Sequence, residues 1–184
     1  TVLLVMADTL ARPSGSAVPG RRTDEYSRQH TFDVGVQMQV LSPCAGRVMA
    51  ITDVNDPTFA GQLVGPGVGI EPPDGLQSVV APADGRLIKV DPHAFILLVD
   101  GVGILVHIGI NTVRLEGRLF EVLAERGEQV TAGTPIVSWD PASVTDPDMD
   151  RTILVVLMDQ APDSIVSPAI GTDVVAGDVL FTQE

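Results

Sequence analysis

The residue best placed to do chemistry in this sequence is His107, which lies inside an apolar run bounded by glycines. The run reads Gly101-Val-Gly-Ile-Leu-Val-His107-Ile-Gly109-Ile-Asn-Thr112-Val113, and short runs of this kind are typical of buried strands. Because strand side chains alternate between two faces, we expect Leu105, His107 and Gly109 to share one face. The apolar residues at 104, 106, 108 and 110 would line the other. Glycine leaves approach to the imidazole open, so we predict that His107 is the reacting residue.

A second histidine, His93, precedes this strand in Asp91-Pro-His93-Ala-Phe-Ile-Leu-Leu-Val. Asp100-Gly101 is a hairpin signal between the two segments, and the loop length decides whether the histidines meet. A two-residue loop would place 93 opposite 108, with the histidines on opposite faces. A three-residue loop with a bulge at Gly101 would place 93 opposite 107. We predict the three-residue loop and a shared face; the alternative is two unrelated core histidines, each bonded to the backbone.

Two histidines on one face permit three kinds of chemistry, and the residues alone leave them open. The pair would bind a metal, act as general acid and base, or supply a nucleophile and a group that stabilises the product. A catalytic zinc ion takes three protein ligands, so zinc at His93 and His107 would need a carboxylate, such as Asp91. The sequence contains no His-Glu-x-x-His, Gly-x-Ser-x-Gly or Gly-x-x-x-x-Gly-Lys motif. Phosphoryl transfer through a nucleophilic His107 is therefore at least as economical as metal catalysis.

Recurring phrases predict an all-β fold with internal duplication. Turn signals about every ten residues favour an antiparallel β-sandwich or barrel. Helix signals are few, so we expect one or two short helices: one at 117–126, where apolar residues have helical spacing, and a capped turn within 140–150. The phrases that share a beginning are Ser42-Pro-Cys-Ala-Gly-Arg-Val, Ala81-Pro-Ala-Asp-Gly-Arg-Leu and Ser167-Pro-Ala-Ile-Gly; a second pair is Glu128-Gln-Val-Thr-Ala-Gly and Thr172-Asp-Val-Val-Ala-Gly.

The composition fits one acidic globular domain in a reducing compartment. The chain has 184 residues, of which 45% are hydrophobic and 19% charged, and its net charge is −13. This charge argues against nucleic acid as a partner, and no apolar run approaches the roughly 20 residues of a membrane span. The single cysteine, Cys44, excludes an internal disulfide and fits a cytoplasmic location. We expect Cys44 to be a buried small residue and not a reactive thiol.

Residues 1–37 differ from the rest of the chain. They contain the linker-like Ala11-Arg-Pro-Ser-Gly-Ser-Ala-Val-Pro-Gly and a polar stretch from Arg21 to His30. We interpret them as an N-terminal extension or interdomain linker, in which His30 is solvated, and residues 38–184 as the functional domain.

The stretch from Gly101 to Val113 also carries a family signature: Gly-x-x, three apolar residues, His107, an apolar residue, Gly109, an apolar residue, any residue, Thr112 and Val113. Other matching segments follow in family order: Ser42-Pro-Cys-Ala-Gly-Arg-Val, Asp56-Pro-Thr-Phe59-Ala, Val64-Gly-Pro-Gly, Val80-Ala-Pro-Ala-Asp-Gly, His93-Ala-Phe95 and Gly127-Glu-Gln-Val-Thr-Ala-Gly. Residues 38–184 thus resemble the glucose-type enzyme IIA domain of the bacterial phosphoenolpyruvate:sugar phosphotransferase system (PTS). The resemblance implies a β-sandwich with a shallow apolar depression that holds two adjacent histidines.

By this resemblance, His107 accepts a phosphoryl group from the phosphocarrier HPr and passes it to a IIB domain during sugar uptake. The IIB domain is either separate or fused to a membrane IIC domain. His93 would hydrogen-bond the phosphoryl oxygens, with Gly109 and Thr112 supporting the site. No cofactor is required, and zinc at the two histidines stays open. A dry apolar rim would hinder hydrolysis of the phosphohistidine; the residues assigned to the partner-binding rim are Asp56, Phe59, Leu63, Val64, Phe95, Leu105, Asn111, Val113 and Arg114.

Three positions depart from the family pattern. Asp91 stands where many relatives have a threonine that donates a hydrogen bond, and a carboxylate would repel phosphate. Asn111 and Arg114 replace acidic residues that recognise arginines on the partners, so docking is altered or a different cognate pair compensates. Two alternatives follow: a regulatory binding module that has lost phosphotransfer, and a zinc hydrolase of similar architecture. The intact His93 and His107 argue against the first, and the lack of a His-x-His pair argues against the second.

Overall fold

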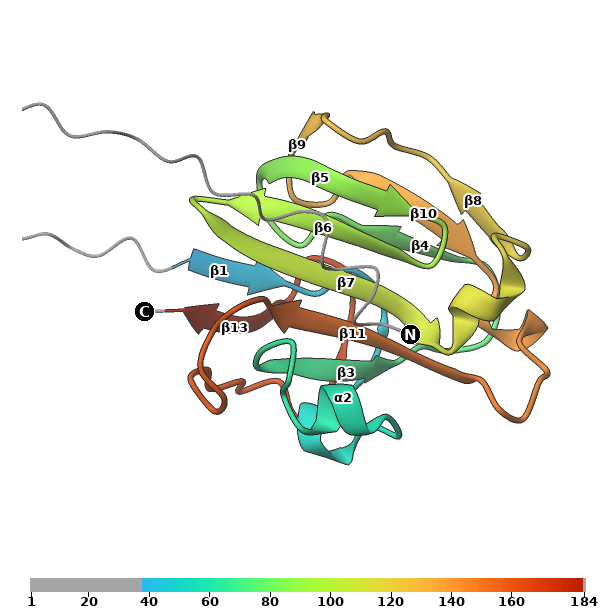
Figure 1. Ribbon diagram of the computed structural model, residues 1–184, viewed down its shortest axis with the longest axis horizontal. Helices are drawn as coiled ribbons and strands as arrows, with labels where there is room; N and C mark the ends of the chain where they lie inside the picture. The colour runs from blue at the N-terminus through green and yellow to red at the C-terminus, as the bar shows by residue number, and fades with distance from the viewer. Residues whose placement is uncertain (1–37, 184) are drawn as a thin grey trace, which may run out of the picture. The chain divides into compact units, whose positions relative to one another are not determined.

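The computed structural model describes residues 38–183, so the predicted extension or linker at 1–37, including His30, lies outside the described residues. The strands form one eight-stranded sheet, one three-stranded sheet and one two-stranded pair (Figure 1). All pairings between strands are antiparallel, which confirms the predicted all-β fold. The strands are β1 (Met38–Leu41), β2 (Gly46–Ala50), β3 (Gly67–Glu71), β4 (Gln77–Val80), β5 (Gly85–Asp91), β6 (Ala94–Val99), β7 (Val102–Ile110), β8 (Phe120–Val122), β9 (Gln129–Val130), β10 (Pro135–Trp139), β11 (Asp150–Leu157), β12 (Asp173–Val174) and β13 (Val179–Gln183).

The larger sheet and the smaller sheet contribute to one apolar core. The larger sheet has the strand order β12-β2-β3-β11-β7-β6-β5-β9, and the smaller sheet has the order β4-β10-β8. Removal of this apolar surface from water is the main stabilising term of such a fold. The core side chains include Phe95, Ile104 and Val106 from the larger sheet, and Val79, Val137 and Trp139 from the smaller one.

Two of the three phrases with a shared beginning fold into equivalent structures, which agrees with the predicted duplication. These phrases begin at Ser42 and Ala81, and each of these residues donates its backbone N–H to the second phrase of its own repeat: Ser42 to the Asp178 oxygen at 2.7 Å and Ala81 to the Thr134 oxygen at 2.8 Å. In return, the Ser42 oxygen accepts from the Gly177 N–H and the Ala81 oxygen accepts from the Gly133 N–H, both at 2.9 Å. The fold is therefore duplicated at the level of individual hydrogen bonds.

The two copies also exchange hydrogen bonds with each other. The Leu41 N–H donates to the Pro82 oxygen and the Val80 N–H donates to the Pro43 oxygen, both at 2.8 Å. Since each phrase is followed by a strand, β2 and β5 occupy equivalent positions and pair with the short strands β12 and β9. The duplicated turns thus fix where β5 starts, and with it the hairpin that follows.

The predicted helix at 117–126 is wrong. Residues 120–122 form β8, which pairs with β10. Glu116, Gly117 and Leu119 have φ values of 53°, 85° and 75°, and such left-handed conformations are incompatible with a right-handed helix. The apolar residues with helical spacing stay at the surface, where Leu119, Val122 and Leu123 are 42%, 43% and 47% exposed.

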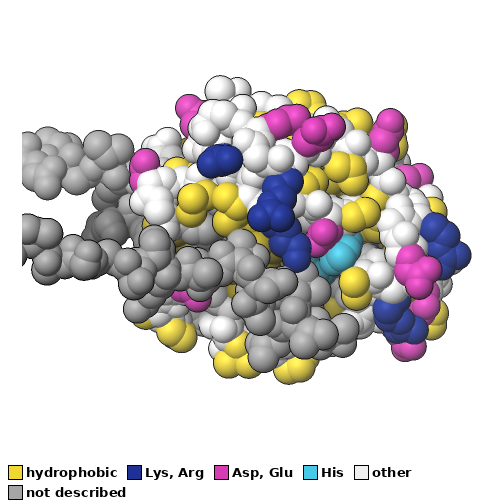
Figure 2. All heavy atoms as spheres, turned by 45° about the horizontal axis from the view of Figure 1, so that its top comes forward, with side chains coloured by type: hydrophobic (Ala, Val, Ile, Leu, Met, Phe, Trp, Pro, Cys, Tyr) yellow, Lys and Arg dark blue, Asp and Glu magenta, His cyan; other side chains and the backbone are white. Residues whose placement is uncertain are grey.

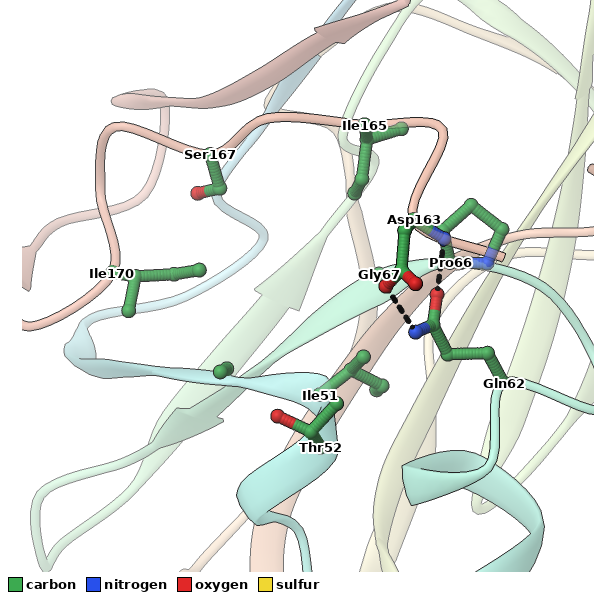
Figure 3. A pocket seen from close by; sticks show the side chains of 10 residues that line it. Ile51, Thr52, Gln62, Pro66, Gly67, Asp163, Ile165, Ser167 and Ile170 are labelled. Atoms are coloured by element: carbon green, nitrogen blue, oxygen red, sulfur yellow. Dashed lines mark hydrogen bonds between the residues drawn. The ribbon is translucent and has the colours of Figure 1, made fainter. Parts of the chain in front are cut away.

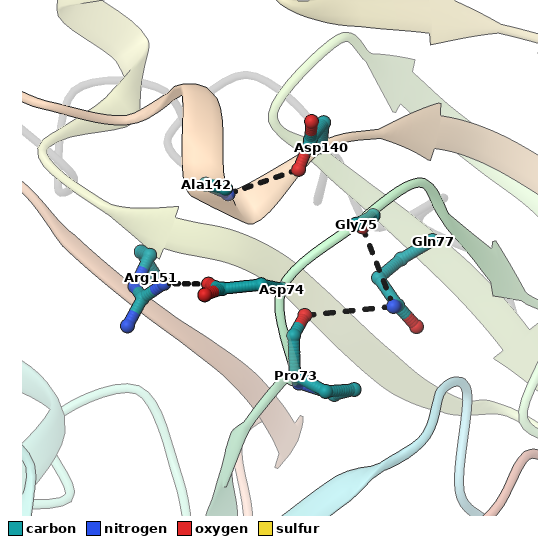
Figure 4. A network of polar contacts seen from close by, with 7 residues as sticks. All are labelled: Pro73, Asp74, Gly75, Gln77, Asp140, Ala142 and Arg151. Atoms are coloured by element: carbon teal, nitrogen blue, oxygen red, sulfur yellow. Dashed lines mark hydrogen bonds and ion pairs between the residues drawn. The ribbon is translucent and has the colours of Figure 1, made fainter.

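The helical elements that form are very short: α2 (Pro57–Ala60) and the 3-10 turns η1 (Ile51–Asp53), η2 (Thr112–Leu115) and η3 (Pro141–Ser143). The capped turn expected within 140–150 is η3, in which the Asp140 carboxylate accepts from the Ala142 N–H at 3.0 Å (Figure 4). Within residues 38–183, no helix has the length and apolarity that a membrane crossing requires.

The loop after β3 is fastened to the start of β11. Arg151 forms an ion pair with Asp74, and the Gln77 side-chain amide donates to the backbone oxygens of Pro73 and Gly75 at 3.5 and 3.4 Å (Figure 4). Because the Asp74 side chain is 73% exposed, this pair contributes at most about 1 kcal/mol to stability.

Cys44 is 1% exposed, and burial raises the pKa of its thiol to about 12. A thiol with so high a pKa holds almost no thiolate at neutral pH and is a poor nucleophile. Cys44 is therefore a core residue, as predicted.

Candidate functional site

His107 lies in the middle of the larger sheet, on the face opposite the shared core. Its strand β7 runs between β6 and β11, and its direct neighbours across the sheet are Ala94 and Leu154. The core cluster includes Ile104, Val106 and Ile108 but neither Leu105 nor His107. The alternation of faces predicted for this strand is thus confirmed over residues 104–108, and His107 is 5% exposed.

His93 lies beside His107, although the predicted hairpin loop is wrong. Val99 pairs with Val102, so the loop is the two-residue Asp100-Gly101 turn, and the His93 oxygen accepts from the Ile108 N–H at 2.7 Å. The imidazole rings nevertheless approach to 5.4 Å between centroids, edge to face. They meet because His93 sits in the tight turn between Asp91 and Ala94, where strand alternation no longer governs its direction.

A hydrogen bond to the backbone fixes the protonation of the His107 ring. Nδ1 lies 2.6 Å from the Gly109 oxygen, and a carbonyl oxygen only accepts, so Nδ1 must carry the proton. The contact requires the backbone of Gly109 to turn its carbonyl back toward the ring, with a φ of 75°. Nε2 therefore keeps its lone pair and is the nucleophilic nitrogen of the ring.

The strands are irregular at this point, which accommodates Gly109. Asp150 pairs with Ile110 and Ile153 pairs with Ile108, so two residues of β11 face the single residue Gly109. Such a β-bulge redirects side chains and often lies next to active sites. Thr112, which is 0% exposed, closes the turn by donating from Oγ1 to the Ile108 oxygen at 2.6 Å.

The surroundings keep His107 neutral. Burial, together with the nearby His93, lowers the pKa of His107 from 6.5 to about 4, while the hydrogen bond to Gly109 and the charge of Asp56 raise it less. The pKa of His93 is also lowered, mainly by burial. The charge of Asp91 raises this pKa, and the charge of Lys89 lowers it. At neutral pH His107 is thus an uncharged imidazole, as nucleophilic attack requires.

Phe59 packs against the His107 ring. Its centroid is 5.5 Å from that of His107, and its side chain is 1% exposed. Asp56 holds it there by capping α2, since its Oδ1 accepts from the N–H groups of Thr58 at 2.8 Å and Phe59 at 3.2 Å. An aspartate before Pro at the first helical position is a strong N-terminal signal.

The predicted rim residues divide into three groups. Leu63 is 73% exposed; Asn111 and Arg114 are exposed, while Val113 and Asp56 are half-buried. Val64 and Leu105 are only 9% and 2% exposed, so they lie below the surface. Phe95 was placed at the rim wrongly: it pairs with Val106, faces the core and is 0% exposed.

The three positions that depart from the family pattern are all engaged in polar contacts. Asp91 forms an ion pair with Lys89 at 3.3 Å. Asn111 donates to the Asp148 oxygen at 2.8 Å, and Arg114 forms an ion pair with the Asp148 carboxylate at 4.0 Å. Figure 2 shows a histidine side chain at the surface with acidic, basic and hydrophobic side chains around it.

The donor set does not support zinc. Among residues 38–183 no group of three or more His, Cys, Asp or Glu side chains is close enough together to hold a metal ion, whereas a zinc site takes three or four protein ligands. The zinc considered for His93 and His107, and the zinc-hydrolase alternative, therefore lack support from these residues.

Sequence reasoning missed one feature of this site and one long-range contact at the end of α2. The Gly109 carbonyl is a backbone group, and its contact with the ring leaves no signal beyond the glycine two residues after the histidine. The side-chain contact between Gln62 and Asp163 joins residues 101 apart in sequence, which spacing cannot reveal. The capping role of Asp56, by contrast, was readable from Asp56-Pro57.

Comparison with known proteins gives a consistent result. The family model described as phosphoenolpyruvate-dependent sugar phosphotransferase system, EIIA 1, matches residues 38–162. The glucose permease IIA of Mycoplasma capricolum has a similar structure, with a TM-score of 0.72 and 29% identity; the match covers 80% of this chain and 96% of that one.

Curated relatives include single-domain and multidomain proteins. The PTS glucose-specific EIIBCA component of Corynebacterium glutamicum is 44% identical over 110 residues, which are 58% of this chain and 16% of the relative. The N-acetylglucosamine-specific EIICBA component of Escherichia coli is 38% identical over 140 residues, 74% of this chain and 21% of the relative. The glucose-specific EIIA component of Staphylococcus epidermidis is 39% identical over 111 residues, 59% of this chain and 66% of the relative. The chain thus spans about a fifth or less of the multidomain relatives and just under two thirds of the single-domain one.

We predict that His107 titrates far below the ordinary histidine value of 6.5. Its NMR chemical shifts should show a midpoint near pH 4, with the Nδ1–H tautomer present above it. Because the unfolded chain binds a proton at His107 below pH 6.5 and the folded chain does not until about pH 4, the free energy of unfolding should decrease as the pH falls through this range. His107→Gln should remove this part of the slope, and a midpoint near 6.5 in the native protein would contradict the buried, neutral ring.

We predict that Gly109→Ala damages the site more than a matched glycine substitution does. A Cβ at Gly109 would lie 2.4 Å from Thr112 Cγ2 and 2.9 Å from the Asp150 oxygen, whereas at Gly101 nothing lies within 4 Å. Both glycines have positive φ values, 75° and 87°, so Gly101→Ala should cost only about 1 kcal/mol of stability for its backbone. Gly109→Ala should cost about 1–3 kcal/mol more, through overpacking, and should shift the His107 tautomer. Equal unfolding midpoints in urea would contradict this geometry.

Proposed function

The chain belongs to the EIIA 1 family of the phosphoenolpyruvate-dependent sugar phosphotransferase system. From this membership we propose that the Nε2 atom of His107 carries a phosphoryl group. The observation that supports the proposal is the 2.6 Å contact between Nδ1 and the Gly109 oxygen. This contact leaves Nε2 unprotonated on a neutral, buried ring.

In the proposed transfer, the lone pair of Nε2 attacks the phosphorus of a phosphohistidine on HPr. The N–P bond of the donor breaks as the Nε2–P bond forms, and no proton has to move during this exchange. Because both ring nitrogens are then substituted, positive charge develops on the His107 ring, and the Gly109 carbonyl accepts a hydrogen bond from its Nδ1–H. In the second transfer a nucleophile of the IIB domain attacks the same phosphorus, the Nε2–P bond breaks and Nε2 regains its lone pair.

His93 is proposed to stabilise the phosphoryl oxygens. Its ring lies edge to face with His107 at 5.4 Å, and its side chain is half-buried at the opening of the site. A ring in this position can donate a hydrogen bond to a group attached to Nε2. Phe59 contributes differently, since an apolar ring against His107 keeps water away from the N–P bond.

The proposed partners are HPr as donor and a IIB domain as acceptor, with a cytoplasmic location. Several relatives combine IIA, IIB and IIC modules in one chain, as the names EIIBCA and EIICBA state. A IIB domain fused to a membrane IIC domain is therefore a suitable acceptor for this domain. No cofactor is proposed.

A reconstituted transfer assay tests this function. With phosphoenolpyruvate, enzyme I and HPr, the wild-type domain should gain one acid-labile phosphate, and His107→Ala should gain none. His93→Gln should still accept phosphate but pass it to IIB about 10²–10³-fold more slowly, the usual effect of removing one positioned donor. Labelling of His107→Ala would contradict the assignment, as would a wild type that stays unlabelled with both a cognate and a heterologous HPr.

A further inference from the structure

A reciprocal contact joins two loops next to the site. Gln62 follows α2, and Asp163 lies in the loop after β11. The Gln62 Nε2 donates to the Asp163 Oδ1 at 2.7 Å, and the Asp163 backbone N–H donates to the Gln62 Oε1 at 2.9 Å (Figure 3). We call this pair the Gln62–Asp163 clasp.

The clasp holds its two residues in conformations that neither adopts readily alone. Gln62 has a φ of 52° and Asp163 a φ of 58°, and a left-handed backbone is strained for a residue with a Cβ. Beside the clasp lies a cavity of about 150 Å³, which apolar side chains such as Ile51, Ile165 and Ile170 line (Figure 3). Gln62 and Asp163 themselves also line this cavity.

A short chain of hydrogen bonds connects the clasp to Phe59. The Gln62 backbone N–H donates to the Phe59 oxygen at 2.9 Å, and the Leu63 N–H donates to the Thr58 oxygen at 3.0 Å. Asp56 caps the other end of α2. The four residues of α2 are too few to be a stable helix by themselves, so the position of Phe59 depends on how both ends are held.

We infer that Gln62 and Asp163 are positioning residues of the phosphoryl site, which hold Phe59 against the His107 ring and so slow the loss of phosphate to water. This inference rests on the proposed function. In that loss, the oxygen of a water molecule attacks phosphorus, the Nε2–P bond breaks, inorganic phosphate leaves and Nε2 regains its lone pair. The clasp suppresses the reaction by excluding water, and it leaves transfer to a docked partner possible.

The first test is the rate at which the isolated phosphorylated domain loses phosphate. Losing about 1 kcal/mol of net hydrogen bonding corresponds to about a fivefold change in the population of the open loop, so Asp163→Ala should raise the hydrolysis rate constant about fivefold. Gln62→Ala removes both bonds and should raise it at least as much. Asp163→Asn keeps an acceptor oxygen and the backbone N–H, and should restore the wild-type rate.

Asp159→Ala is the matched control. Asp159 lies in the same loop, is exposed and has the same φ of 58°, while only its backbone N–H is bonded, to the Val64 oxygen at 3.1 Å. This variant therefore carries the backbone cost of Asp163→Ala without opening the clasp, and its hydrolysis rate should match wild type. If Asp159→Ala and Asp163→Ala accelerate hydrolysis equally, or neither does, the inference is overturned.

A second readout does not depend on phosphorylation. In Asp163→Ala and Gln62→Ala the NMR titration midpoint of His107 should move upward from the wild-type value, and NOEs between Phe59 and His107 should weaken. Unchanged titration and NOEs in folded variants would overturn the clasp while leaving the proposed function intact. A wild type that accepts no phosphate would instead defeat the proposed function, and the titration would still decide the role of the clasp.

Discussion

The hydrogen bond from Nδ1 of His107 to the carbonyl of Gly109 is the interaction on which the site depends. It selects the tautomer, orients the ring and leaves Nε2 as the nucleophile. Burial keeps the ring neutral, so Nε2 holds a lone pair at neutral pH. A polar ring at this depth would cost free energy if unpaired, and the glycine carbonyl offsets that cost.

The rest of the fold serves to place this bond and its surroundings. Gly109 lies opposite a bulge in β11, and the buried Thr112 locks the turn that follows. The duplicated turns at Ser42 and Ala81 set the start of β5, so that its hairpin with β6 brings His93 next to His107. Asp56 on one side and the Gln62–Asp163 clasp on the other hold the short helix that carries Phe59. Elements remote in sequence thus converge on one imidazole.

Sequence reasoning recovered what periodicity and repetition encode. The faces of β7, the duplicated β-architecture and the buried Cys44 follow from alternation, recurring turns and composition. The loop at Asp100-Gly101 was predicted with the wrong length because both lengths suit that dipeptide, and the histidines meet through a turn at His93 that alternation does not describe. The helix expected at 117–126 failed because left-handed residues at Glu116, Gly117 and Leu119 prevent it from starting. Phe95 was misplaced because its role depends on register, which the loop length controls.

Direct identification of the phosphorylated nitrogen tests the central claim. The domain would be labelled with ¹⁵N-histidine, phosphorylated through HPr, and examined by NMR for one-bond coupling between phosphorus and nitrogen. The account predicts coupling to Nε2 of His107 alone, with Nδ1 still protonated and hydrogen-bonded. Coupling to Nδ1 of His107, or to either nitrogen of His93, would contradict it.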